Sequence, residues 1–219
     1  MIDHVFMFVE ADGPEIALLE ATGLVETYRR VHPGQGTRNV CYCFDNLFLE
    51  LLWVDDPDAA RSDPIKRTGL YERSLWRTNG ACPFGIAWRQ SSTHPTMTVP
   101  TWAFTPPYLP DGVSITVATD GDDAGQPMMF ESPGSTAPAD WPPEKRGALQ
   151  HGAGLGAVRE IALMMPPASA PSAALKSIAG NCSPHLRLGQ ASTYAMHMRI
   201  ASLDHEPDVQ LSLPLPPSV

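Results

Sequence analysis

Two ionisable side chains stand in otherwise apolar runs near the start of the chain. His4 lies within residues 2–8 (IDHVFMF), and Glu50 lies within residues 47–53 (LFLELLW). Runs of this length and composition predict β-strands, each with one ionisable side chain directed out of it. An imidazole and a carboxylate held on rigid strands are half of a metal site or of an acid/base site. This pair is therefore the first candidate for function.

The elements that position the pair belong to an internal repeat. Residues 3–23 align without a gap with residues 160–180, and each segment predicts a strand followed by a short helix. Asp12 and Ser169 are the residues expected to cap the two helices at their N-termini. Each half therefore predicts a β-α-β-β-β unit. Its further strands are expected at residues 25–31, 39–44 and 47–54 in the first copy and at 185–188, 193–200 and 209–213 in the second.

Two βαβββ modules, with His on the first strand and Glu on the fourth, resemble the vicinal oxygen chelate superfamily. That group includes glyoxalase I, extradiol dioxygenases and fosfomycin-resistance proteins. The segments 32–37 (HPGQGT), 46–51 (NLFLEL) and 83–89 (PFGIAWR) are more specifically similar to its glyoxalase-like domain branch. The resemblance implies an α+β fold in which two βαβββ modules form a cupped mixed β-sheet around a pocket. It also implies that the pocket often holds a divalent metal, which substrates chelate through adjacent oxygens.

The repeat divides the chain into three parts. Residues 1–57 are expected to form the first βαβββ module, and residues 151–219 the second. Between them, residues 58–150 are predicted to be a linker and an inserted β segment rich in proline and aromatic residues. Proline denies a sheet its backbone donor, so the insertion favours short strands and loops. Its aromatic residues could form a lid or one wall of the pocket, and these are Trp102, Phe104, Tyr108 and Trp141.

The ligand positions of the superfamily can be compared with this sequence. His4 and Glu50 match the pair expected in the first module. In the second copy Ile161 takes the place of His4, and Gln210 or Ser212 takes that of Glu50. A four-ligand site is therefore not expected. A reduced site of His4 and Glu50, with Gln210 as a weak oxygen ligand, could still hold Mn, Fe or Zn.

A further imidazole would complete a site of two histidines and one carboxylate. His151 is a candidate ligand because it closely precedes the first strand of the second copy, although the glycines around it favour a solvated loop. Other available imidazoles are His32, His185 and His197.

Without a metal, His4 and Glu50 could act as an acid/base pair. A carboxylate next to an imidazole orients the ring and favours its protonated form. The pair could then move a proton next to a carbonyl, as an isomerase or lyase requires. Arg89, at the end of the predicted strand 84–89, is the candidate to hold the charge that develops on oxygen.

Two classes of function therefore stay open. The first is an enzyme of the metal-dependent lyase, isomerase or dioxygenase type, with a small-molecule pocket centred on His4 and Glu50. The second is a metal-free protein of the same fold that binds or sequesters a small molecule.

Composition narrows the choice of partners. A net charge of −9 argues against nucleic-acid binding, which needs clustered Lys and Arg. No apolar run approaches the roughly 18 residues that span a bilayer, so we expect a cytoplasmic protein with a small-molecule ligand and no membrane partner. The four cysteines lack metal-site spacing and are expected to be reduced. Two modules in one chain are compatible with either a monomer or a homodimer.

Overall fold

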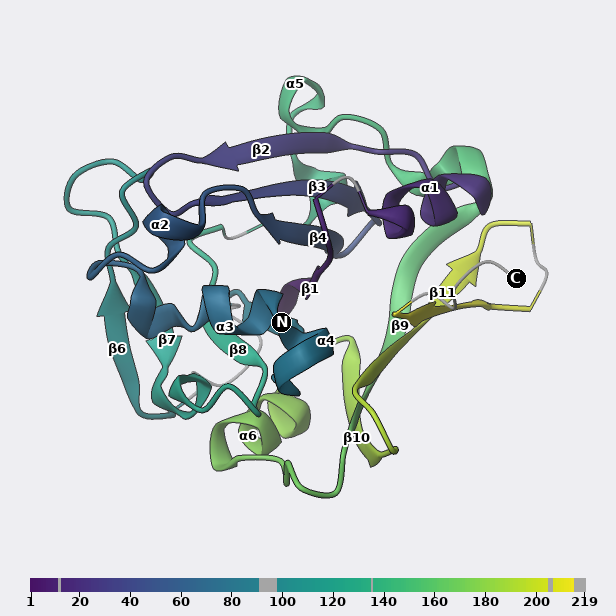
Figure 1. The fold of residues 1–219 in the computed structure, drawn as a ribbon. Helices are drawn as coiled ribbons and strands as arrows, with labels where there is room; N and C mark the ends of the chain where they lie inside the picture. The colour runs from purple at the N-terminus through teal and green to yellow at the C-terminus, as the bar shows by residue number, and fades with distance from the viewer. Residues whose placement is uncertain (12, 91–97, 135, 205–206, 215–219) are drawn as a thin grey trace.

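Two β-sheets and several short helices make up the chain in the computed structural model (Figure 1). The fold class is α+β, as the sequence predicts. The residues that the structure describes are 1–11, 13–90, 98–134, 136–204 and 207–214.

The larger sheet has eight strands in the order β2-β3-β4-β1-β5-β8-β7-β6. Its first half is the βαβββ unit predicted for residues 1–57. This half consists of β1 (Ile2–Phe8), helix α1 (Pro14–Ala21), β2 (Tyr28–His32), β3 (Thr37–Cys43) and β4 (Phe48–Val54). The second half comes from the predicted insertion and consists of β5 (Phe84–Trp88), β6 (Thr101–Phe104), β7 (Ile115–Ala118) and β8 (Met128–Glu131).

The two halves of this sheet have the same internal order. β1 pairs with β4 in parallel, and β5 pairs with β8 in parallel. In each half the two remaining strands follow in antiparallel pairing. β1 and β5 meet as antiparallel neighbours at the seam between the halves. The second half of the cup is therefore supplied by residues 84–131, and not by residues 151–219 as the repeat predicts.

The smaller sheet explains this difference. Its order is β10-β9-β11-β12, and it begins with the predicted strand–helix unit. β9 pairs in parallel with β10 on one edge and in antiparallel with β11 on the other. Both edges of β9 are thus taken within its own sheet, and none is left to join the larger one. The elements are β9 (Leu155–Met165), α6 (Ala173–Asn181), β10 (His185–Gln190), β11 (Ala195–Ser202) and β12 (Val209–Leu213).

Alternation along the strands gives the larger sheet two different faces. Val5 and Leu51 belong to one apolar cluster with Ile161 of the smaller sheet. Phe6 and Leu52, their neighbours in sequence, belong to a second cluster that excludes the smaller sheet. The smaller sheet, green to yellow in Figure 1, therefore covers one face of the larger sheet. The opposite face, which carries His4 and Glu50, is left for a pocket.

Short helices connect these strands. On α3, the fully buried Arg73 donates hydrogen bonds to several backbone carbonyls between Gly121 and Gln126, including Gly121 O at 2.7 Å. It thereby holds the segment that leads into β8. The connecting helices are α2 (Pro57–Ala60), η1 (Lys66–Thr68), α3 (Leu70–Ser74), α4 (Trp76–Asn79), η2 (Thr119–Asp122), η3 (Pro138–Asp140), α5 (Pro143–Arg146) and η4 (Gln150–Ala153).

The helix ends differ in detail from the predicted caps. Asp12 lies outside the described residues, and Gly13 stands at the N-cap of α1. Ser172, rather than Ser169, caps α6, because that helix starts at Ala173, and its Oγ accepts from the N–H of Leu175 at 3.2 Å. No helix among the described residues is long and apolar enough to cross a membrane. All four cysteines are free thiols.

Candidate functional site

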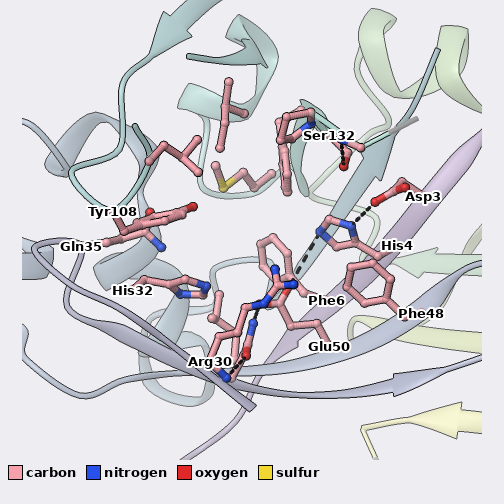
Figure 2. Close-up of a pocket in the computed structure, with 18 of the residues that line it drawn as sticks. Asp3, His4, Phe6, Arg30, His32, Gln35, Phe48, Glu50, Tyr108 and Ser132 are labelled. Atoms are coloured by element: carbon pink, nitrogen blue, oxygen red, sulfur yellow. Dashed lines mark hydrogen bonds and ion pairs between the residues drawn. The ribbon is translucent and has the colours of Figure 1, made fainter. Parts of the chain in front are cut away.

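A pocket of about 680 Å³ lies on the face of the larger sheet that the smaller sheet leaves free. Both halves of the larger sheet contribute to its walls (Figure 2). Polar lining residues include Asp3, His4, Arg30, His32, Gln35, Asn39, Glu50, Tyr108 and Ser132. Apolar lining residues include Phe6, Phe48, Leu52, Leu70, Phe104, Ile115, Met128, Phe130 and Trp141.

The imidazole of His4 is held from several sides. Its Nδ1 lies 2.8 Å from Asp3 Oδ2, and its Nε2 lies 3.6 Å from Glu50 Oε2. The ring stacks on Phe48, with centroids 4.3 Å apart and planes inclined by 15°, and meets Phe130 edge-on at 5.4 Å. His4 is therefore a buried, oriented imidazole whose Nε2 is directed toward a second ionisable group.

Asp3 orients this imidazole although it is adjacent to His4 in sequence. Strict alternation would place it on the opposite face, but the pairing of β1 with β5 is irregular between Ile2 and His4. Burial raises the pKa of the Asp3 carboxyl, and hydrogen bonds from His4, Arg89 and Ser132 outweigh this, so that the pKa lies below its usual value. Asp3 is thus ionised and accepts the Nδ1–H of His4, so that Nε2 is the ring nitrogen left to exchange a proton in the pocket.

Glu50 is fixed by a neighbour on β3. Asn39 Nδ2 donates to Glu50 Oε1 at 2.5 Å, and Asn39 Oδ1 accepts from the backbone N–H of Arg30 at 2.9 Å. The amide of Asn39 is therefore satisfied at both ends and holds one carboxylate oxygen. The other oxygen, Oε2, is the one that faces His4.

The far side of the pocket carries a second polar group (Figure 2). His32 Nδ1 lies 2.8 Å from Thr37 Oγ1, and Gln35 Nε2 donates to the same hydroxyl at 2.8 Å. The ring of Tyr108 lies 4.8 Å from that of His32, centroid to centroid. Burial lowers the pKa of His32, and the charge of Arg30 adds to this effect while Glu50 opposes it. His32 is therefore neutral in the folded protein near pH 7.

The second half of the sheet offers no ligand side chains at the matching positions. In β1 and β4 the paired residues that face the pocket include His4 with Phe48 and Phe6 with Glu50. In β5 and β8 the corresponding pairs are Gly85 with Met128 and Ala87 with Phe130. Met128 and Phe130 line the pocket, so this half forms an apolar wall.

Residues 2–96 match the family model described as the glyoxalase-like domain. Over these residues, which are less than half of the chain, the protein is similar to the glyoxalase-like domain. The resemblance to the vicinal oxygen chelate superfamily, drawn above from short sequence segments, is thereby confirmed. The match covers β1 to β5 and therefore includes the seam between the two halves of the larger sheet.

Solved structures give more distant likenesses. A hypothetical protein from Staphylococcus aureus is 10% identical, with 88% of this chain and 87% of that chain covered and a TM-score of 0.49. A methylmalonyl-CoA epimerase in complex with methylmalonyl-CoA and NH4+ is 14% identical, with 62% and 96% covered and a TM-score of 0.37. The epimerase from Mycobacterium tuberculosis is 13% identical, with 59% and 85% covered and a TM-score of 0.35. No curated protein matches this chain.

The structure brings His4 and Glu50 together, but it does not bring the other predicted site residues to them. Arg89 does not line the pocket, because its guanidinium donates to Asp3 Oδ1 at 3.0 Å and to Asn46 O at 2.8 Å. His151 is exposed and lies 2.6 Å from Asp45 Oδ1. Gln210 lies on β12 in the smaller sheet, opposite Arg199, away from the pocket lining.

The residues predicted for the second half-site lie in the smaller sheet and not at the pocket. Ile161 on β9 is buried between the two sheets, and Ser212 on β12 bonds to His197 at 2.8 Å. Neither lines the pocket. Because the smaller sheet packs behind the larger one, its strands have no access to the face that carries His4.

The pocket offers few donor atoms for a divalent metal. His4 Nε2 and Glu50 Oε2 are the two atoms that face each other, and His32 Nδ1 is bonded to Thr37. Within the described part of the chain no group of three or more His, Cys, Asp or Glu is placed to hold a metal ion. Protein metal sites of this type use at least three such ligands. The residues therefore do not fit a resident metal, and no step below is assigned to one.

Three residues of the site escape sequence reasoning. Asn39 lies within a predicted strand but carries no charge. It stands two residues from Cys41, which pairs with Glu50, and this spacing is the signal that could have placed Asn39 on the same face as Glu50. Asp3 requires the irregular pairing at the start of β1. Tyr108 lies in the predicted insertion, where its aromatic ring suggested a wall but not a contact with His32.

Proposed function

We propose that this protein is an enzyme that moves a proton on a carbon next to a carbonyl group of a small molecule. His4 and Glu50 are the acid/base pair. The observation that carries the proposal is the buried chain from Arg89 through Asp3 to His4, which ends at Glu50 inside the pocket. A solvated surface histidine would need no such support.

His4 is the group that takes the proton. Asp3 holds Nδ1–H, so the lone pair on Nε2 is directed into the pocket. When Nε2 takes the proton, the electron pair of the broken C–H bond moves toward the neighbouring carbonyl and an enolate forms. The ionised Asp3 stabilises the imidazolium, as a buried carboxylate does in other acid/base sites.

Glu50 completes the exchange. Its Oε2 lies 3.6 Å from Nε2, close enough to stabilise the imidazolium or to receive its proton after a small side-chain movement. Asn39 keeps the carboxylate in place through Oε1. The proton then returns to the same carbon from either group, or to a different atom of the substrate in an isomerisation.

The other possibilities from the sequence stay open to the same experiment. One is the divalent metal, Mn, Fe or Zn, predicted from the sequence on His4 and Glu50, although no third His, Cys, Asp or Glu of the described residues joins this pair. The second is a protein that binds a small molecule without chemistry. The cytoplasmic location, and the choice between monomer and homodimer, stay predictions from the sequence.

The direct test is deuterium exchange. A panel of 2-oxo acids, ketones and aldehydes is incubated with the protein in D2O, and the loss of the proton next to the carbonyl is followed by NMR. The wild type should accelerate exchange in at least one compound. Exchange should fall at least about 100-fold in both His4→Gln and Glu50→Gln, as removal of a general base does. The control is His151→Gln, because that imidazole is exposed on the surface.

Metal dependence is read in the same assay. Protein prepared with EDTA should retain exchange, and adding Mn, Fe or Zn should change it little. Exchange that requires one of these ions would replace the proton-transfer proposal by the metal site. Binding of a panel member without exchange would support a binding protein, and exchange that survives both substitutions would remove His4 and Glu50 from the mechanism.

A further inference from the structure

A positively charged side chain lies at the pocket. Among the described residues that line the cavity, Arg30 is the sole Lys or Arg. No ion pair joins its guanidinium to a carboxylate in the described part of the chain, and the group lies 4.6 Å from the centre of the Tyr28 ring. His32 beside it is neutral, for the reasons given above. A cation without a carboxylate partner at the edge of a cavity is suited to bind an anionic group of a ligand.

The position of Arg30 on β2 directs it toward the pocket. Tyr28, Arg30 and His32 stand at alternate positions of the strand and line the cavity, and Val31 also reaches it. Arg29, which lies between them, is absent from the lining and bonds to Glu26 Oε2 at 2.7 Å. Arg30 is also close to the acid/base pair, because its backbone N–H donates a hydrogen bond to the Asn39 side chain that holds Glu50.

The opposite wall would receive an uncharged part of the ligand. Met128 and Phe130 of β8 line it together with Phe104 and Ile115. A volume of about 680 Å³ falls within the range of pockets for drug-sized molecules and exceeds the needs of a three-carbon compound. The cavity therefore has a cationic edge, an acid/base centre and an apolar wall.

We propose that the ligand is a 2-oxo acid with an aromatic or branched aliphatic side chain. Its carboxylate binds the guanidinium of Arg30, its reacting carbon lies at His4 and Glu50, and its side chain packs on the apolar wall. This assignment rests on the proposed function for the place of the reacting carbon. A single guanidinium matches a single carboxylate through two parallel hydrogen bonds.

The test uses phenylpyruvate as the probe and measures its dissociation constant by calorimetry. Phenylpyruvate should bind to the wild type, and Arg30→Met should weaken it at least about tenfold. The matched control is Arg29→Met, the neighbouring arginine on the same strand, which should change the affinity less than twofold. Arg30→Lys should bind with intermediate affinity, because the charge remains and the fork is lost.

Three ligand controls identify the groups recognised. In the wild type, phenylpyruvate methyl ester should bind more weakly than the acid. In Arg30→Met, the ester and the acid should bind with equal affinity. Pyruvate, which lacks the ring, should bind at least about tenfold more weakly than phenylpyruvate because it buries less apolar surface. Phenyl phosphate should bind no more tightly than phenylpyruvate. If it binds more tightly, the anionic group recognised by Arg30 is a phosphate ester and not a carboxylate.

Several results would overturn the assignment. It fails if phenylpyruvate does not bind, if the ester binds as tightly as the acid, or if Arg29→Met loses as much affinity as Arg30→Met. The outcome is separate from that of the exchange experiment, because binding is measured without turnover. Binding that depends on Arg30 but is not followed by proton exchange would support the ligand class and contradict the proposed reaction. Proton exchange that is unchanged in Arg30→Met would support the reaction and contradict the ligand class.

Discussion

The two halves of the larger sheet share one strand order and differ in the side chains they direct at the pocket. β1 and β4 present His4 and Glu50, held by Asp3 and Asn39. β5 and β8 present small and apolar residues in the same register, with Phe130 against the His4 ring. A symmetric scaffold thus carries an asymmetric site.

This difference separates two tasks. A polar pair on rigid strands can exchange a proton, whereas an apolar wall binds a ligand and lowers the water content around the pair. The second half also supports the first from outside the pocket. Arg89, which directly follows β5, bonds to the Asp3 that orients His4. The halves are therefore coupled through their seam.

The largest effect is expected from breaking that coupling. Arg89→Met removes the cation from a pair in which the Arg89 and Asp3 side chains are 3% and 5% exposed. The buried Asp3 carboxylate would keep its hydrogen bonds with His4 and Ser132 but lose its guanidinium partner, and the free energy of unfolding should fall by about 3 kcal/mol. Chemical denaturation followed by fluorescence measures it. The control, Arg187→Met, breaks an exposed pair with Glu160 and should cost less than about 1 kcal/mol. Equal losses would show that the Arg89–Asp3 pair gives no special support.

A smaller effect is expected from crowding the seam. A Cβ added to Gly85 on β5 would lie 2.0 Å from Cε1 of Phe6 on β1. Gly85→Ala should therefore displace the Phe6 ring and lower the free energy of unfolding by about 1–3 kcal/mol. Gly180→Ala in α6 is the control of opposite sign, because no atom lies within 4 Å of the added methyl group. It should raise the free energy of unfolding by about 0.5–1 kcal/mol. An unchanged Gly85→Ala protein would mean that the halves are loosely joined.

Sequence patterns predict the individual strands well in this protein. Alternating and continuous apolar runs predict β1, β3, β4 and β5 to within two residues, because side-chain periodicity is a local property. The pair of His4 and Glu50 follows from the same patterns, and the structure brings the two side chains to 3.6 Å. Both predictions depend on residues that are close in sequence or on a familiar module.

The pairing of distant strands could not be predicted in the same way. The repeat of residues 3–23 at 160–180 reports a strand followed by a helix, and such a unit can join either sheet. Which sheet it joins depends on the hydrogen-bonding edges of β9, which are both taken by β10 and β11. Contacts between residues far apart in sequence also decide the place of Arg89. The sequence predicts that Arg89 lies in the pocket, whereas its guanidinium binds the carboxylate of Asp3, 86 residues away in sequence.

The apolar half of the larger sheet can be given a metal ligand by one substitution. The rings of Phe130 and His4 are 5.4 Å apart, so Phe130→His would bring a second imidazole to His4 and Glu50. The site would then have two histidines and one carboxylate, a set that binds divalent transition metals. Co²⁺ affinity, read from its visible absorption, should rise at least about tenfold over the wild type. Phe130→Leu adds no ligand and should leave it unchanged. A wild type that already binds Co²⁺ as tightly would contradict the view that the second half lacks a ligand.

The smallest effect concerns the polar half alone and depends on pH. Burial lowers the pKa of His32 in the folded protein, relative to about 6.5 in the unfolded chain. As the pH falls below 6.5, the unfolded chain binds the proton more readily, so the wild type loses stability. His32→Gln removes this contribution and should lose less stability between pH 7.5 and pH 5 in denaturation experiments, roughly the window in which histidine titrates. His185→Gln, an exposed histidine on β10, should behave as the wild type does. If His32→Gln and the wild type lose the same amount, His32 binds its proton as readily in the folded protein as in the unfolded chain. Arg30 is then not the sole positive charge at that edge of the pocket at acidic pH.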